Sequence, residues 1–232
     1  MGAEYVTGDV TDLGLLRRFC RGLDRVYHTA AIVKEGGEWS GFFRVNVLGA
    51  DSVAMAARDA GVRDFVHFSS VMVHGFDFPD GVTEEGPLDP ADNAYCTTKI
   101  LSEEAVMRHH EPGRFEVYVI RPGDVYGPGS VPWTIRPVEM MRRRQWVYID
   151  SRRSIFNHVY IDNLLDGLDL VVARRASWTP GGRPGGGYGA LRGVAPGRRD
   201  GAVAQRCDPG PQHREARPEE SSLLGTLPVH GL

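Results

Sequence analysis

The sequence predicts an α/β fold, in which buried strands alternate with helices and build an open parallel sheet. Two runs rich in aromatic and β-branched residues, 63–70 and 115–120, have the pattern of buried strands. Between them, residues 93–103 read as a helix that carries Tyr95 and Lys99. Ligands of open parallel sheets bind outside the carboxyl ends of the strands. This order of elements therefore predicts a binding site where the two strands end.

Tyr95 and Lys99 are four residues apart, a spacing that places both side chains on one face of a helix. A nearby positive charge favours the phenolate and lowers the pKa of a tyrosine hydroxyl. The pair therefore predicts a tyrosine that exchanges protons near neutral pH. Only two of the 27 Lys and Arg residues are lysines, Lys34 and Lys99, which argues against an incidental lysine here. The spacing alone is also compatible with an exposed helix pair.

Further motifs extend this pattern in both directions along the chain. They cover residues 6–12, 15–22, 24–31, 46–61 and 156–163. In order and spacing, from about residue 5 to 170, the chain resembles the extended short-chain dehydrogenase/reductases, also called NAD-dependent epimerase/dehydratases. The resemblance implies, in the same order, the family's third strand, a short helix, the fourth strand with its His-x-Ala-Ala ending, an alanine-rich helix opened by Asn46, and a late strand-to-helix element near the substrate.

The implied fold is a partial Rossmann-like, doubly wound parallel sheet that lacks its first strands. No G-x-x-G-x-x-G loop, whose amides would hold the cofactor pyrophosphate, precedes Gly8. The end of the second strand, where an acidic or basic residue selects NAD or NADP, is also absent. The implied cofactor is therefore NAD or NADP, without a choice between them. We expect the 232-residue chain to bind either one poorly or not at all.

The composition changes after about residue 170. Residues 171–232 contain 12 Gly and 7 Pro, which is typical of chains that do not fold. One interpretation is a natural, disordered Arg/Gly/Pro-rich tail, whose arginines could contact nucleic-acid phosphates. The other is a reading-frame shift in a GC-rich gene. The expected domains are a partial NAD(P)-binding Rossmann-like domain over 1–170 and a low-complexity tail over 171–232.

The global composition indicates an intracellular protein. A net charge of −3 gives no general attraction to nucleic acid or membranes. No apolar run reaches the roughly 18 residues of a membrane-spanning helix, and the N-terminus has no signal-sequence pattern. Cys20, Cys96 and Cys207 lack metal or redox spacing, so no metal site is expected. We expect a cytoplasmic protein with a small-molecule substrate, without nucleic-acid or membrane partners; a homodimer is compatible with the resemblance.

The resemblance implies hydride transfer at a carbon that bears a hydroxyl. Tyr95 would move the hydroxyl proton, Lys99 would lower the pKa of Tyr95 and hold the nicotinamide ribose, and Ser70 would hydrogen-bond the developing alkoxide or carbonyl oxygen. The other expected cofactor contacts are Asp9 and Val10 at the adenine, Ala30 and Ala31 at a close backbone approach, Asn46, and Pro122 and Val125 at the nicotinamide.

Several of these residues also have structural interpretations. Ser70 could simply end a strand. Asp9 could cap the helix that follows it, although Asp12 or Thr11 is the better candidate, and Asn46 could be only an N-cap. These alternatives stay open on the sequence alone.

Polar residues outside the proposed set have mainly structural interpretations. Packing or backbone hydrogen bonds explain His28 and His74 better than catalysis does. His158 could touch substrate or be structurally satisfied. Glu84 and Glu85 (residues 84–85) lie in a Gly/Pro-punctuated loop and read as solvated. The arginines at 142–144 read as solvated, with a substrate role as the alternative.

The expected activity is NAD(P)-dependent oxidation, reduction or epimerisation of a secondary alcohol or ketone. Nucleotide sugars are the first substrate class to consider, and steroid-like or flavonoid-like alcohols the next. A dehydratase is disfavoured, because Val71 and Met72 stand where the family's dehydratases place Asp-Glu. The alternative is a non-catalytic remnant or scaffold that has lost cofactor binding. Scaffold relatives usually lose the Tyr–Lys pair, which this chain keeps.

Overall fold

The computed structural model describes residues 3, 5–34, 36–78, 81–145 and 156–173. All of them belong to one compact unit, Met1–Arg199. A second unit, Asp200–Leu232, lies outside the described residues. The tail expected over 171–232 therefore stays a prediction, apart from its first residues, which continue the last described helix.

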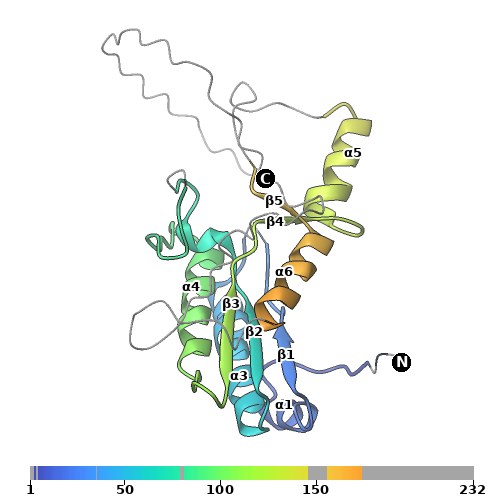
Figure 1. The fold of residues 1–232 in the computed structure, drawn as a ribbon. Helices are drawn as coiled ribbons and strands as arrows, with labels where there is room; N and C mark the ends of the chain where they lie inside the picture. Colours follow the sequence, from blue (N-terminus) through green and yellow to red (C-terminus); the bar gives the residue numbers. More distant parts are fainter. Residues whose placement is uncertain (1–2, 4, 35, 79–80, 146–155, 174–232) are drawn as a thin grey trace. The chain divides into compact units, whose positions relative to one another are not determined.

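The main sheet has three parallel strands, in the order β1 (Arg25–His28), β2 (Asp64–Phe68) and β3 (Glu116–Ile120) (Figure 1). The register pairs His28 with His67 and Phe68 with Ile120. The carboxyl ends of all three strands therefore lie at one edge of the sheet. The α/β fold with a parallel sheet is confirmed.

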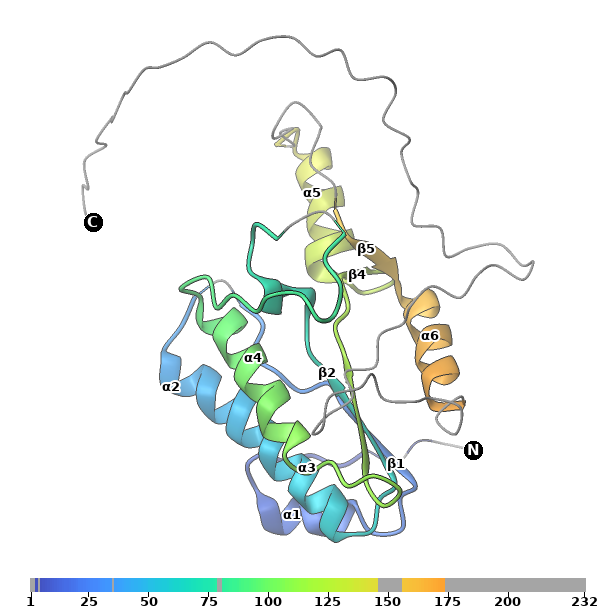
Figure 2. The same cartoon turned by 60° about the vertical axis from the view of Figure 1, so that its left-hand side comes forward.

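Helices cover both faces of this sheet, as Figure 2 shows. One face packs against α3 (Ala50–Asp59) and α4 (Ala94–Met107), and the other packs against α6 (Ile161–Ala173). With helices on both faces, the strands are buried on both sides, as is usual for parallel sheets. This explains why residues 117–120 are all apolar or aromatic.

Adjacent residues of a strand pack into the hydrophobic cores on opposite faces of the sheet. On β3, Val117 and Val119 belong to the core beneath α3 and α4, whereas Tyr118 and Ile120 belong to the core beneath α6. On β2, Phe65 and Val66 divide in the same way. This follows from the period of two that strands impose on side-chain direction.

The strand expected over residues 6–12 is absent. Residues 5–9 form no regular element, and Tyr5 is 92% exposed. A strand needs a neighbour to accept and donate its backbone hydrogen bonds, and no described strand lies beside this segment. The prediction of a third family strand here is therefore wrong for the described residues.

The helix after this segment is α1 (Leu13–Phe19), capped by Asp12. The Leu15 amide donates to Asp12 Oδ1 over 3.0 Å, which confirms Asp12 as the N-cap. Asp9 instead accepts from the amide and hydroxyl of Thr11. Its pKa is lowered, chiefly by the hydrogen bond from the Thr11 amide.

A single helical run precedes β2 and begins earlier than expected. It consists of α2 (Trp39–Phe42), the π-helical segment η1 (Phe43–Gly49) and α3. Asn46 is only 1% exposed in the middle of this run. The interpretation of Asn46 as an N-cap is therefore wrong. Single π-turns inside helices are often found at functional sites, and here the segment holds a buried amide side chain.

A second parallel pair joins β4 (Asp124–Tyr126) and β5 (His158–Tyr160). β5 runs directly into α6, which confirms the strand-to-helix element expected over 156–163. Three further elements complete the described part: η2 (Val71–His74), η3 (Val131–Ile135) and α5 (Arg136–Arg142).

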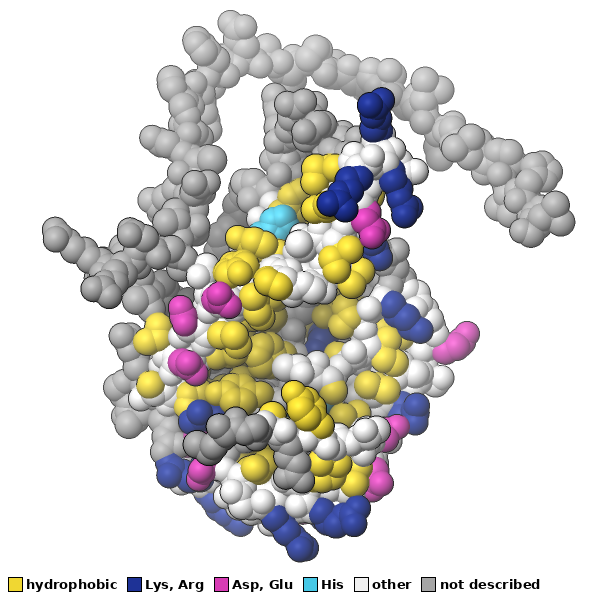
Figure 3. Space-filling model, turned by 90° about the vertical axis from the view of Figure 1, so that its right-hand side faces the viewer, with side chains coloured by type: hydrophobic (Ala, Val, Ile, Leu, Met, Phe, Trp, Pro, Cys, Tyr) yellow, Lys and Arg dark blue, Asp and Glu magenta, His cyan; other side chains and the backbone are white. Residues whose placement is uncertain are grey.

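Aromatic side chains gather at the second strand pair. The ring centroids of Trp133, Phe156 and His158 lie 5.3–6.1 Å apart. Phe156 is 59% exposed, and Figure 3 shows apolar side chains reaching the surface on the face it displays. His158 therefore sits in an exposed ring cluster, which leaves its expected contact with substrate untested.

Among the described residues, no helix is both long enough and apolar enough to cross a membrane.

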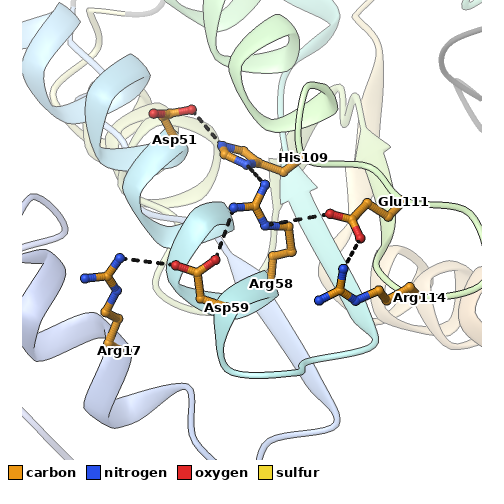
Figure 4. Close-up of polar contacts among 7 residues, drawn as sticks. All are labelled: Arg17, Asp51, Arg58, Asp59, His109, Glu111 and Arg114. Atoms are coloured by element: carbon orange, nitrogen blue, oxygen red, sulfur yellow. Dashed lines mark hydrogen bonds and ion pairs between the residues drawn. The ribbon is translucent and has the colours of Figure 1, made fainter.

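A network of ion pairs and hydrogen bonds connects α1 and α3 to the turn after α4 (Figure 4). The His109 ring donates to Asp51 over 2.8 Å through Nε2, and Arg58 approaches its Nδ1 at 3.2 Å. Arg58 also pairs with Asp59 at 3.1 Å and Glu111 at 3.9 Å. Because a guanidinium can only donate, the Nδ1 atom of His109 is the acceptor of its contact with Arg58.

Replacing Arg58 with methionine should lower the free energy of unfolding by about 1 kcal/mol, and less at high salt. The loss arises because Arg58 contacts three groups from two segments and is 30% exposed. Urea unfolding of Arg114→Met is the control, since the Arg114 side chain is 76% exposed. An equal loss in both variants would argue against the network.

Candidate active site

The described chain places Lys99 at the carboxyl end of β2. Its Nζ donates to the carbonyl oxygen of Phe68 over 2.7 Å, and the side chain is only 4% exposed. Burial of an amine disfavours its charged form. The pKa of Lys99 is accordingly lowered to about 8 by desolvation, against an opposing effect of Glu103.

Local capping fixes where Tyr95 stands. The side chain of Asn93 accepts hydrogen bonds from the amides of Tyr95 and Cys96, at 2.9 and 3.2 Å, and so begins α4. Tyr95 occupies the first turn, and Lys99 follows one turn later with its Nζ 5.9 Å from the Tyr95 ring centroid. The shared helix face expected from the spacing is confirmed.

Ser70 follows the end of β2 and does two things. Its hydroxyl accepts from the Met72 amide over 3.2 Å and caps η2, so it does end the strand region as the structural interpretation proposed. It also forms a side-chain hydrogen bond with Tyr95. Ser70, Tyr95 and Lys99, which the resemblance grouped together, thus lie together at one strand end.

The pKa of Tyr95 departs from the expectation. It is raised, because burial opposes the phenolate more strongly than the hydrogen bond from Ser70 favours it. Lys99 does not offset this burial, because its amine is turned to the Phe68 carbonyl. Lys99 is not among the causes of this shift, so its expected effect on the pKa of Tyr95 stays a prediction.

Two buried histidines stand beside Lys99. His28 and His67 are paired on neighbouring strands, and their rings stack with centroids 5.4 Å apart. Burial lowers the pKa of His28 to about 4 and that of His67 well below its usual value, and Lys99 contributes to both shifts. Both rings are therefore neutral at pH 7. The packing interpretation of His28 is supported by this stacking.

Acid should destabilise the protein through these rings. The folded-state pKa of His28 is about 4 against 6.5 for an ordinary histidine, so between these values the unfolded state binds more protons. The free energy of unfolding then falls as pH drops through this window, by about 3 kcal/mol in all for a shift of this size. Urea unfolding at a series of pH values measures the loss. In His28→Phe the acid-dependent loss should shrink; an unchanged pH dependence would exclude His28 as its source.

Asn46 links the loop after β1 to α4. The amide of Ile32 donates to Asn46 Oδ1 over 2.7 Å, and Asn46 Nδ2 donates to the Ile32 carbonyl at 3.2 Å and to Thr98 Oγ1 at 3.1 Å. Ala30 and Ala31, where a close backbone approach was expected, lie directly before this anchored residue. Asn46 thus positions the loop, and its direct contact with cofactor stays a prediction.

The remaining expected cofactor residues have varied surroundings. Asp9 is exposed and lies 3.9 Å from Arg44. Val10 is half-buried over Gly49, where an added Cβ would lie 2.7 Å from Val10 Cγ2. Val10 therefore packs in the core, and its expected contact with adenine stays untested.

Pro122 and Val125 follow β3. The Pro122 carbonyl accepts from the Val71 amide over 3.1 Å, which joins this segment to the Ser70 turn. Val125 is half-buried and packs against the core beneath α6. Pro122 therefore lies beside the Ser70–Tyr95 group, whereas Val125 is partly used in packing.

Sequence reasoning missed the buried ion pair behind these residues. Arg121 donates to both carboxylate oxygens of Glu103, at 2.8 and 2.6 Å, with side chains 7% and 1% exposed. It also donates to the Glu84 carbonyl over 2.7 Å. The signal was available: Glu103 is four residues after Lys99 and so shares the helix face of Tyr95 and Lys99.

The other polar residues singled out in the sequence lie outside this group of side chains. The Nδ1 of His74 lies 2.8 Å from the Pro87 carbonyl oxygen, which confirms a backbone-bonding role. Residues 84–85 lie in a loop, and the arginines at 142–144 are exposed, as expected. Cys20 and Cys96 are free and buried. The described residues include no group of His, Cys, Asp and Glu suited to hold a metal.

The hydrogen-bonding groups at this strand end are chemically suited to the ribose of a dinucleotide. The hydroxyls of Tyr95 and Ser70 and the amine of Lys99 are suited to a ribose and a secondary alcohol at the strand ends. Buried polar atoms without a hydrogen-bond partner in the described part also lie here, on His28, His67 and Ser69. No G-x-x-G-x-x-G triple occurs in the 232-residue sequence.

A model of the NAD dependent epimerase/dehydratase family matches residues 2–182. A ketoreductase of a farnesylated quinoline oxide from Stigmatella aurantiaca is 29% identical over 188 residues, covering 78% of this chain and 54% of its own length. A 3 beta-hydroxysteroid dehydrogenase/isomerase from Mycobacterium tuberculosis is 28% identical, covering 73% and 49%. The chain thus spans about half the length of the curated relatives it matches.

Solved structures of similar enzymes also match this chain. The dTDP-glucose 4,6-dehydratase DesIV from Streptomyces venezuelae, with NAD bound, superposes with a TM-score of 0.65 at 29% identity, over 73% of this chain and 54% of that one. WbmG from Bordetella bronchiseptica, in complex with NAD, has a TM-score of 0.63 at 26% identity, over 78% and 55%. The chain is therefore similar, in sequence and in fold, to proteins whose structures contain NAD.

Proposed function

Because this chain belongs to the NAD-dependent epimerase/dehydratase family, we propose that it is an NAD-dependent oxidoreductase or epimerase that acts on a secondary alcohol or ketone. The observation that carries the proposal is the meeting of Ser70, Tyr95 and Lys99 at the carboxyl end of β2. Relatives that serve only as scaffolds usually lose the Tyr–Lys pair, so its presence favours catalysis over the alternative of a non-catalytic remnant or scaffold.

Each side chain has a defined part in the proposed reaction. Bound NAD would supply the hydride acceptor or donor. The Tyr95 hydroxyl exchanges a proton with the substrate hydroxyl, and Ser70 donates a hydrogen bond to the substrate oxygen as charge develops there. Lys99 offers its remaining N–H groups to the ribose while one stays on the Phe68 carbonyl.

The proposed substrate is a nucleotide sugar or a steroid-like alcohol. A solved relative, MoeE5, was crystallised with UDP-glucose and NAD, and it is 27% identical to this chain with a TM-score of 0.62. The hydroxysteroid dehydrogenase above supports the second class. Both substrates present a secondary alcohol, so the same three side chains serve either one.

The test is hydride transfer by the 232-residue chain, followed by nicotinamide absorbance at high NAD concentration. UDP-glucose and a 3β-hydroxysteroid are the substrates to compare. Turnover is expected for one of them, and it should disappear in Lys99→Ala but persist in Lys34→Ala, a variant at the chain's other lysine, which is exposed.

Calorimetry with NAD measures the affinity separately. Weak binding is expected, because the glycine triple is absent, and micromolar binding would contradict that expectation. No turnover at any NAD concentration, with the protein folded, would favour the non-catalytic alternative. Equal turnover in the two lysine variants would contradict the role of Lys99.

A further inference from the structure

Two hydrogen-bonded connections join Lys99 to β2. The first is the direct bond from its Nζ to the Phe68 carbonyl, at 2.7 Å. The second starts at the Lys99 carbonyl, which accepts from the Ser102 hydroxyl over 2.8 Å. That hydroxyl lies 3.0 Å from Nε2 of His67, the residue before Phe68. The side chain and the backbone of one lysine are thus tied to adjacent residues of one strand.

The direction of these bonds follows from the number of protons available. The Ser102 hydroxyl has one proton, and the Lys99 carbonyl can only accept it. Towards His67, Ser102 must therefore accept, so His67 carries its proton on Nε2 and donates it. Its Nδ1 is then unprotonated, and that atom is buried without a hydrogen-bond partner in the described part of the chain. The neutral tautomer of His67 that is protonated on Nε2 therefore accounts for both hydrogen bonds of the Ser102 hydroxyl.

Burial makes this connection unusual. His67 is 1% exposed and Ser102 is 0% exposed; His67 stands between Val66 and Phe68 on β2, and Ser102 lies on the inner face of α4. A buried polar group costs free energy unless it is paired. An apolar residue at either position would have filled the same space. The two polar residues therefore do something that packing alone does not require.

We propose that His67 and Ser102 are positioning residues for Lys99, which hold its turn of α4 against β2 and so keep its amine on the Phe68 carbonyl. For its effect on turnover this inference rests on the proposed function. The hydrogen-bonded connection itself does not depend on a cofactor.

The charges around the amine agree with this role. Four ionisable groups face or neighbour Lys99: Tyr95 and Glu103 on its own helix, and His28 and His67 on the strands. Both imidazoles are neutral at pH 7, because burial lowers the pKa of each. Neutral rings can lie beside an ammonium group without repelling it. The hydrogen bonds through Ser102 thus connect His67 to Lys99 without placing a second positive charge near the amine.

The chain offers a clean probe, because Lys34 and Lys99 are its only lysines. Protein grown with ¹³C-labelled lysine gives two side-chain Cε signals, and Lys34→Arg assigns them. The Cε shift of Lys99 then reports the pKa of its amine in the full chain, without cofactor or substrate. In the unmodified protein this pKa should lie at about 8.

Four variants separate positioning from packing. His67→Phe keeps a ring but removes the Nε2 donor. Ser102→Ala removes the hydroxyl that links His67 to the Lys99 carbonyl. In both, Lys99 should reach water more easily, and its pKa should rise towards 10.5, by on the order of one unit. His67→Gln restores a donor and Ser102→Thr restores a hydroxyl, so both should return the Lys99 signal towards that of the unmodified protein.

Unfolding in urea is measured alongside, because a purely structural role would change stability and leave the pKa of Lys99 unchanged. An unchanged or lower pKa of Lys99 in His67→Phe and Ser102→Ala overturns the proposal, and so does a failure of both restoring variants. Turnover is a separate readout, in which the two disruptive variants should lower kcat. Absence of turnover in the unmodified chain would count against the proposed function only, while the lysine signal still decides the positioning role.

Discussion

Tyr95→Phe should lower the turnover number by about 10²–10⁴-fold, the range lost when a general acid or base is removed. The affinity for NAD should be nearly unchanged, because the ring still packs in the first turn of α4 and only the hydroxyl is lost. Steady-state kinetics measure the first quantity and calorimetry the second. The Ser70 hydroxyl loses its bond to Tyr95 but keeps the Met72 amide as a donor, so η2 should remain capped.

Tyr27→Phe is the matched control, since Tyr27 is 44% exposed on β1 and lies outside the proposed site. It should retain full turnover. Turnover of Tyr95→Phe equal to that of the unmodified chain would remove Tyr95 from the proposed chemistry. A parallel fall in both variants would indicate a general loss of fold instead.

Glu103→Gln should lower the free energy of unfolding by up to about 3–5 kcal/mol, the range expected when one partner of a buried ion pair is removed. Arg121 would keep its bond to the Glu84 carbonyl but lose the carboxylate that meets it at two points. Urea unfolding measures the loss. Because Glu103 also raises the pKa of Lys99, the same variant should lower that pKa further.

Glu104→Gln provides the comparison, because Glu104 is exposed on the same helix and its loss should cost less than about 0.5 kcal/mol. The double variant Glu103→Met with Arg121→Met should be more stable than Glu103→Gln, since neither charge is then left buried alone. A double variant that is less stable than Glu103→Gln would show that the two charges are not coupled as the distances imply.

The sequence predicted the elements whose patterns depend on neighbours close in the chain. The Tyr95–Lys99 spacing determines a shared helix face, and the apolar runs determine β2 and β3, so all of these were found. Asp12 was one of the two candidates preferred as the cap of α1, with Thr11, because capping is a local interaction of a side chain with amides two or three residues later.

What the sequence did not predict depends on contacts between distant segments. Residues 6–12 were expected to contain a strand, but they have no partner strand in the described chain. Asn46 was expected to contact the cofactor or to be an N-cap, and its role inside a π-turn was not foreseen, because its partners, Ile32 and Thr98, lie far along the chain. The pKa of Tyr95 could not be foreseen, because it depends on how deeply the ring is buried and on where the Lys99 amine points.

The alternation of side chains along β3 has a consequence for shortening the protein. One face of the sheet is covered by helices that precede β3 in the chain, whereas the other is covered by α6, which comes last among the described elements. A version cut before Ile161 would leave Tyr118, Ile120 and Val66 facing water. Keeping both faces of the sheet covered therefore requires α6, and a piece that ends before Ile161 should aggregate instead of folding.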